Sequence, residues 1–304
     1  MLEMTVILLR WLQYAGAVVL MGAPLFWLVN DRREGGLETA SARPVLATAA
    51  AVTALAALTA LVAQTAMMTG SLAEAMKPDA LSFMVGGTAL GMALIVRAAA
   101  AGLGLVAVLM FRSGRGLWSG MVLAGAVVTA SFAWTGHGAA TEGWGGVVHL
   151  AADVVHALAA ALWLGALAAM VLLLLRREGR DDWAAHRALH GFAGLGTVAV
   201  ALLTLTGIVN SGFLVGLANI GALGDSPYGR LLIVKLALFV LMLALAAGNR
   251  FRLTPELHSV LSQGQAPQGI FRRLRRSIVV ETLTGAALLA VVAAMGIMAP
   301  PSAL

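Results

Sequence analysis

Cysteine is absent from this chain of 304 residues. Its absence excludes disulfide frameworks, thiolate metal sites and cysteine nucleophiles. Charged residues are scarce, since Asp, Glu, Lys and Arg make up 11% of the chain, against roughly 25% in a typical soluble domain. The sequence also lacks a His-Glu-x-x-His motif, a paired Asp-x-x-x-Asp motif and a nucleophile elbow. These absences argue against an ordinary soluble protein and against a membrane metalloprotease or prenyltransferase.

Long apolar runs dominate what is present, because 60% of the residues are hydrophobic. A run of about 20 apolar residues can cross a bilayer core of roughly 30 Å. We therefore predict an all-α, polytopic integral membrane protein whose single transmembrane domain covers residues 1–304. The N-terminal run lacks a basic n-region and a small-x-small cleavage site, so we expect it to be retained as the first span. The eight predicted spans cover residues 4–29, 45–69, 83–111, 117–135, 147–175, 190–214, 229–249 and 277–299.

Positive charge is divided unevenly between alternate loops. Fifteen of the 20 Lys and Arg residues lie in the loops after the first, third, fifth and seventh predicted spans. The loops on the opposite side hold only Lys77 and Arg230. The positive-inside rule therefore predicts that both termini lie outside the cytoplasm. The same rule explains the net charge of +6 without a nucleic acid, and we expect the "FRRLRR" run to contact anionic lipid headgroups.

Titratable side chains gather in the stretch "GHGAATEGWGGVVHLAADVVH", residues 136–156. His149, Asp153 and His156 are spaced i, i+4, i+7, so they form one stripe along the first two turns of the fifth span. Because polar groups are costly against hydrocarbon, we expect this stripe to face the helix bundle. His137 lies in the outer loop that precedes the stripe.

The stripe has the residue types and the spacing of metal ligands. His149 and Asp153 can share one ion, and so can Asp153 and His156, because each pair is about one helical turn apart. The two histidines are about 10 Å apart along the helix axis, too far to share an ion. The spacing predicts either two stations in series or one site completed by other helices. Packing roles for the individual side chains remain the alternative.

Methionines on the same side of the membrane widen the candidate ligand set. Met67 and Met68 end the second predicted span. Thioether sulfur prefers Cu(I), and imidazole accepts Cu(I), Cu(II) or zinc, so a cysteine-free set of His and Met suits copper. Methionine also fills apolar cores, which is the alternative for this pair. The predicted copper ligands are His137, His149, Asp153, His156, Met67 and Met68.

Further charged residues fall within the predicted spans, among them Arg10, Arg97, Lys235 and Glu281. Arg97 lies near the middle of the third span, where we expect no acidic partner at its depth. Lys235 lies near the outer end of the seventh span and is expected to extend toward water. Glu281 lies near the inner end of the eighth span, and we expect it to pair with neighbouring arginines.

Three histidines lie on the predicted cytoplasmic side. His186 and His190, again i, i+4, lie at the start of the sixth span. They form either a solvated interfacial pair or an inner release site for a metal. His258 falls in a predicted loop, and we assign it no role.

These segments resemble the copper resistance protein D family (CopD/PcoD). The run "TGHGAATEGWGGVVHLAADVVHALAAALWLGAL" is similar to its pattern of Gly-His in the outer loop, then His, Asp and His on the next helix, then Trp-x-Gly. Other segments resemble the family in the same order, so the likeness spans nearly the whole chain. The sequence departs from the family at Gln13, where many members have His, and at "HRALHGF". The further matching segments are "RWLQYAGAVVLMGAPLF", "VALLTLTGIVN" and "SPYGRLLIVKLALFVLMLALAAGNRFRL".

The resemblance implies an eight-helix, multi-pass protein of the bacterial inner membrane that moves copper from periplasm to cytoplasm. It also implies a periplasmic copper carrier of the CopC type as donor. Some relatives carry a CopC domain in the same chain, and we expect no such domain here. Carried over by position, the family's outer-face groups are His137, His149, Asp153 and His156. A transporter or metal-handling protein is therefore expected rather than an enzyme.

Two other functions remain open. A haem b redox protein with two His ligands needs histidines at matched depth on two helices. The outer intramembrane histidines here share one helix, so this alternative takes the form of a haem with His and Met ligands. The other alternative is a copper-delivery factor for oxidase assembly.

Overall fold

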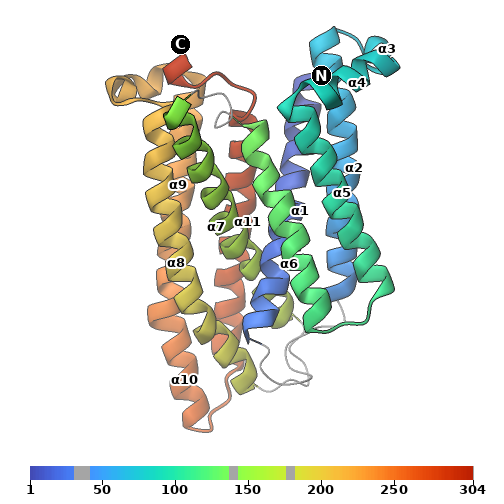
Figure 1. Ribbon diagram of the computed structural model, residues 1–304. Coiled ribbons are helices and arrows are strands. Elements are labelled where there is room, and N and C mark those ends of the chain that lie inside the picture. The colour runs from blue at the N-terminus through green and yellow to red at the C-terminus, as the bar shows by residue number, and fades with distance from the viewer. Residues whose placement is uncertain (31–41, 137–142, 176–181, 304) are drawn as a thin grey trace.

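The computed structural model describes residues 1–30, 42–136, 143–175 and 182–303, and these residues contain no strand. Eight of their helices are long and apolar enough to cross a membrane, which confirms the predicted all-α class. Both termini lie at the same end of the bundle, here called the terminal end, and the opposite end is called the far end (Figure 1). The eight long helices are α1 (Leu2–Asn30), α2 (Ala42–Thr69), α5 (Ala89–Met110), α6 (Arg115–Ala130, extended by the 3-10 turn η1, Ser131–Thr135), α7 (Gly143–Leu175), α8 (Asp182–Leu214), α9 (Pro227–Gly248) and α11 (Gln268–Met295).

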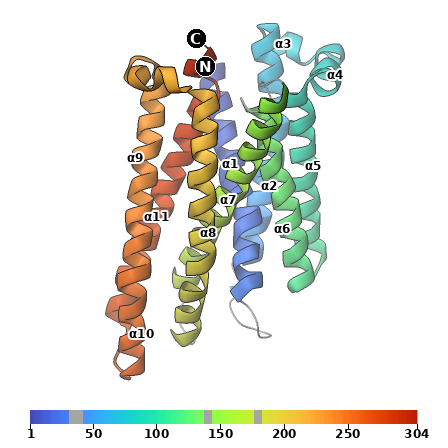
Figure 2. The ribbon, with the colours of Figure 1, turned by 60° about the vertical axis from the view of Figure 1, so that its left-hand side comes forward.

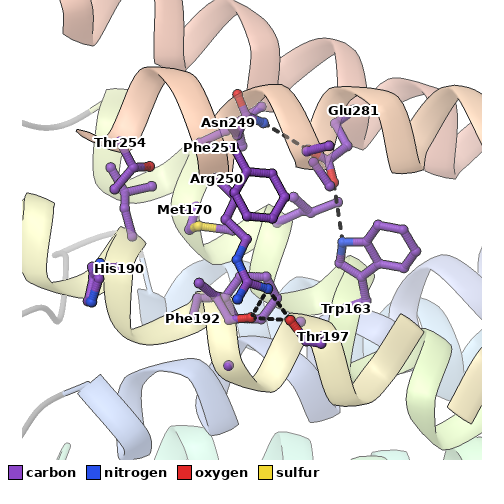
Figure 3. A pocket seen from close by; sticks show the side chains of 18 of the residues that line it. Trp163, Met170, His190, Phe192, Thr197, Asn249, Arg250, Phe251, Thr254 and Glu281 are labelled. Carbon is purple, nitrogen blue, oxygen red and sulfur yellow. Dashed lines mark hydrogen bonds between the residues drawn. The ribbon is translucent and has the colours of Figure 1, made fainter. Parts of the chain in front are cut away.

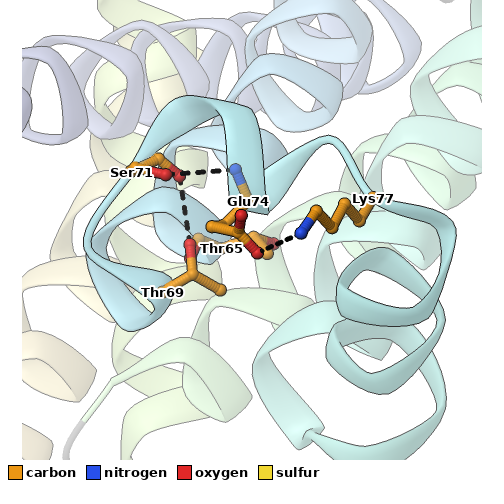
Figure 4. Close-up of polar contacts among 5 residues, drawn as sticks. All are labelled: Thr65, Thr69, Ser71, Glu74 and Lys77. Atoms are coloured by element: carbon orange, nitrogen blue, oxygen red, sulfur yellow. Dashed lines mark hydrogen bonds and ion pairs between the residues drawn. The ribbon is translucent and has the colours of Figure 1, made fainter.

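Two short helices, α3 (Leu72–Ala75) and α4 (Pro78–Gly87), lie at the terminal end between α2 and α5. The Ser71 hydroxyl caps α3 by accepting a hydrogen bond from the backbone N–H of Glu74. Glu74 also pairs with Lys77 at 2.7 Å (Figure 4). The third predicted span began too early, because the apolar helix α4 is separate from α5. The chain is extended at Thr88, whose hydroxyl caps α5 by accepting from the N–H of Gly91.

Three helices extend beyond their predicted ends on the far side. α8 begins at Asp182 rather than at residue 190, and α11 begins at Gln268 rather than at residue 277. α9 continues through a π-helical turn, η4 (Asn249–Leu253), into α10 (Thr254–Ser262). The prediction that His258 lies in a loop is therefore wrong, because His258 belongs to α10. Hydropathy detects only the apolar part of a helix, and these charged turns carry no such signal.

α1 and α7 form the centre of the bundle. α1 packs against α2, α6 and α7, whereas α7 also packs against α8 and α11. α2 pairs with α5 and α9 pairs with α11, so the N-terminal and C-terminal helices form two groups that meet along α1 and α7 (Figures 1 and 2). Small residues allow this close contact, as is common between helices in membranes. A Cβ atom on Gly165 would lie 2.6 Å from the Cα of Gly22 and would collide with the carbonyl oxygen of Val18.

Candidate metal centre

His149 and Asp153 lie on the face of α7 that packs against α8. The His149 ring is 1% exposed and stacks on Phe213 of α8, with ring centroids 4.7 Å apart. One turn further along α7, an oxygen of Asp153 accepts a hydrogen bond of 2.6 Å from Nδ2 of Asn210. The expectation that the stripe faces the bundle rather than lipid is therefore confirmed.

His156 continues this contact toward the far end, and its partner fixes the protonation of its ring. Nδ1 of His156 lies 2.9 Å from the hydroxyl oxygen of Thr206. That hydroxyl donates its own proton to the backbone carbonyl of Leu202 at 2.6 Å. While the hydroxyl keeps this bond, it accepts from the imidazole, which favours the tautomer that carries the ring proton on Nδ1. Nε2 keeps its lone pair, and a neutral imidazole held in this way by a second group is the form that binds metals.

Asn210 contributes an oxygen to the same contact. The residue is 8% exposed, and its Nδ2 is used by Asp153. Its Oδ1 is buried and makes no hydrogen bond to the described part of the chain. An amide oxygen beside a carboxylate favours a cation, because the oxygen has lone pairs and no proton. The α7–α8 contact thus offers a carboxylate, imidazole nitrogens and an amide oxygen within a few turns.

A third helix, α9, brings a positive charge to this region. Lys235 and Tyr228 both interact electrostatically with the Asp153 carboxylate. Lys235 was expected to extend toward water; it is half-buried, and its electrostatic interaction with Asp153 places its charge within range of this carboxylate. The positive charge of Lys235 offsets the negative charge of Asp153, so an incoming metal ion meets less net negative charge at the stripe.

The structure does not place the remaining predicted ligands, His137, Met67 and Met68, at the stripe in the part of the chain that it describes. His137 lies outside the described residues. The side chains of Met67 and Met68 are 39% and 59% exposed at the end of α2, which packs on α1 and α5, whereas the stripe faces α8 (Figure 1). Among the residues that the structure describes, no three His, Asp or Glu side chains are already grouped to hold one ion.

Thr206 and Asn210 are functional candidates that the sequence reasoning missed. They lie four residues apart in "TLTGIVN", a segment quoted only for its resemblance. Their spacing puts them on one face of α8, and a polar pair within an apolar helix was the available signal. The sequence did not reveal that this face meets the stripe, because that depends on the register between two helices.

Arg97 and Gln13 form a separate polar cluster in the N-terminal group of helices. The Arg97 side chain is 2% exposed and donates to the Gln13 amide oxygen and, at 3.0 Å, to the Ser131 hydroxyl. Its guanidinium lies 3.8 Å from the centroid of the Phe132 ring. These partners are neutral, as expected. Gln13, which stands where many members of the resembling family have His, is thus used to hold Arg97.

Glu281 does not pair with arginines as expected. It is 1% exposed, and its two oxygens accept from Nε1 of Trp163 at 3.2 Å and from Nδ2 of Asn249 at 3.0 Å (Figure 3). Because α11 begins at Gln268, Glu281 lies well inside the helix and faces α7 and η4. The arginines of the "FRRLRR" run lie more than one turn before it.

Comparison with known proteins places these features in context. A model described as "Copper resistance protein D-like, N-terminal domain" matches residues 1–147, and one described as "Copper resistance protein D" matches residues 186–295. Copper resistance protein D of Pseudomonas syringae pv. tomato is 32% identical over 303 residues, which cover 97% of this chain and 96% of that protein. No solved structure matches.

Two further relatives match over shorter segments. Copper transport protein CutJ of Bacillus subtilis (strain 168) is 32% identical over 144 residues, which cover 47% of this chain and 24% of CutJ. Inner membrane protein YebZ of Escherichia coli (strain K12) is 28% identical over 134 residues, which cover 43% of this chain and 45% of YebZ.

Proposed function

Because the chain belongs to the copper resistance protein D family, we propose that it binds copper at the stripe on α7 and moves it toward the cytoplasm. In this proposal the terminal end faces the periplasm, as the distribution of positive charge predicts. The membrane is the bacterial inner membrane, and a periplasmic carrier of the CopC type supplies the metal. Copper is the cargo of a transporter rather than the cofactor of an enzyme.

The contact between α7 and α8 supports this proposal more than any other observation. His149, Asp153 and His156 follow one another in depth on a face that is turned away from lipid. Neutral imidazole suits either oxidation state of copper, and the carboxylate adds charge compensation. Because these ligands lie at successive depths in the membrane, a copper ion can move inward by exchanging one pair of ligands for the next. Each station must hold the ion weakly enough to release it onward.

A Cu(I) titration of the purified protein against a chromophoric chelator tests the proposal. We expect the wild-type protein to bind copper and the double variant His149→Ala/His156→Ala to lose at least one bound ion per chain. Val155→Ala is the matched control, because Val155 is an exposed residue of the same helix. Unchanged affinity and stoichiometry in the double variant would overturn the proposal. A Soret band in the visible spectrum would instead favour a haem protein.

Thr206→Val is expected to weaken copper binding at the deeper station by about 10–100-fold, as removal of an outer-shell partner does at metal sites. Valine keeps the volume of threonine but cannot accept the Nδ1 proton of His156, so the ring loses its fixed tautomer. The same titration measures the effect. Thr204→Val is the control, since the Thr204 hydroxyl bonds only to the backbone of its own helix at Val200. Equal affinities of the two variants would show that Thr206 does not orient the ligand.

A further inference from the structure

A cavity of about 860 Å³ opens near the far end between α7, α8, α9, η4, α10 and α11. Its wall is mostly apolar, with Trp163, Phe192 and Phe251 among the lining residues, but it also includes polar groups. Figure 3 shows Glu281 and Asn249 on one side of the cavity and His190 on another. Oδ1 of Asn249 is buried and makes no hydrogen bond within the described residues.

Three histidines meet at the rim of this cavity, and we call them the far-end histidines. His186 and His190 come from the first turns of α8, and His258 comes from α10. The centroid of the His186 ring lies 5.1 Å from that of His258 and 6.0 Å from that of His190. Trp183 packs its ring edge-on against His186 and His258, with centroids 5.7 and 5.5 Å away. Half of the chain's six histidines are thus gathered in one place.

The π-helical turn η4 joins α9 to α10, the helix that carries His258. Pro255 has no N–H to donate to the preceding turn, and its ring would collide with the carbonyl four residues earlier in a regular α-helix. A wider π turn relieves this conflict, and such turns are frequent at functional sites. Arg250 in η4 donates to the hydroxyl of Thr197 and, at 3.2 Å, to the carbonyl of Ala193, both on α8. These bonds hold η4, from which α10 continues, against α8.

The spacing of these rings suits a shared metal ion. Two imidazoles that bind one ion at about 2.0–2.1 Å have their ring centroids roughly 5–6 Å apart. The pair His186 and His258 fits this range, with ring planes tilted by 44°. The ring of His190 is stacked on that of His186 at an interplanar angle of 21°, so it must rotate to direct a nitrogen at the same ion. Met170, a soft thioether ligand, lines the same cavity. The three rings are not grouped around one point in the described residues. The smallest site therefore consists of two ligands, His186 and His258. The side chain of His190 is exposed and can join them as a third ligand.

We propose that His186 and His258, assisted by His190, form a second metal site at the far end, selective for a soft or borderline ion such as Cu(I). Arg187 and Arg250 lie close by, and their positive charge makes the site a weak one that releases its ion readily. The assignment of this site as the exit of a copper path rests on the proposed function. The existence of the site does not, because its geometry is independent of the stripe.

Cu(I) titrations of four purified full-length proteins test the inference. The wild-type protein is expected to bind one more ion per chain than His186→Ala/His258→Ala, and at least one more than His149→Ala/His156→Ala. The variant that combines all four changes is expected to bind none. If the far-end double variant binds as many ions as the wild type with the same affinity, the inference is overturned. The stripe variant is judged separately, so the far-end site and the proposed function can fail independently.

The single variant His258→Ala tests the site without disturbing the core, because His258 is exposed whereas His186 is buried. It should lower the affinity of the far-end site at least tenfold. Ser259→Ala is its control, since Ser259 is the next residue of α10 and is exposed as well. Addition of Cu(II) to the stripe variant should also give an electron paramagnetic resonance spectrum with nitrogen splitting, which His258→Ala should change. An unchanged spectrum and affinity would contradict the assignment.

Discussion

Gly165→Leu is expected to prevent the protein from folding into its native bundle. The added side chain has no space, because its Cβ would already lie 2.6 Å from the Cα of Gly22 and would collide with the carbonyl of Val18. Overpacking against flexible side chains costs about 1–3 kcal/mol. Here the neighbours are backbone atoms that cannot rotate away, so the two helices must separate and the central contact of the bundle is lost.

The measurement is the yield of monodisperse protein on size-exclusion chromatography, together with its thermal unfolding midpoint. Gly22→Leu should behave like Gly165→Leu, because a Cβ on Gly22 would lie 2.7 Å from the Cα of Gly165. Gly120→Leu is the matched control, since no atom lies within 4 Å of a Cβ at that position on α6. Native-like yield and stability of Gly165→Leu would mean that α1 and α7 do not cross at these glycines.

Hydropathy predicted the spans because the cost of exposing polar groups to lipid is large and local. It failed at the ends of helices, where the chain leaves the apolar layer and helical structure no longer requires apolar residues. The start of α8 and the whole of α10 lie in such segments, where polar residues interrupt the apolar pattern. That failure hid the far-end histidines, because His258 was predicted to lie in a loop and was given no role.

The orientation of the stripe could be predicted, whereas its partners could not. His149, Asp153 and His156 share a face by helical periodicity alone, and the cost of burial against lipid turns that face inward. The partners Thr206 and Asn210 depend on how α8 slides and rotates against α7. This register is set by the packing of many side chains, and one sequence does not reveal it. The expected pairing of Glu281 with arginines failed for the same reason, because α11 turns this carboxylate toward Trp163.

Asp153→Asn is expected to weaken Cu(I) binding at the stripe about a hundredfold. The change removes a carboxylate charge while it keeps the size of the side chain, and it leaves the Lys235 ammonium uncompensated beside the site. Two unit charges a few ångströms apart interact by roughly 3–4 kcal/mol at the effective dielectric constant of a protein. A loss of about 3 kcal/mol corresponds to the expected hundredfold change in affinity. Competition titration of the purified variant measures it.

Lys235 provides the complementary test. Lys235→Met removes the opposing charge and should raise Cu(I) affinity at the stripe, and in the Asp153→Asn background it should restore part of the lost affinity. Lys77→Met is the matched control, because Lys77 is an exposed lysine paired with Glu74 at the surface. If Lys235→Met lowers the affinity in both backgrounds, the ammonium stabilises the loaded site instead of opposing it. If Asp153→Asn binds copper as tightly as the wild type, the carboxylate does not contribute charge to the ion, and the histidines alone must hold it.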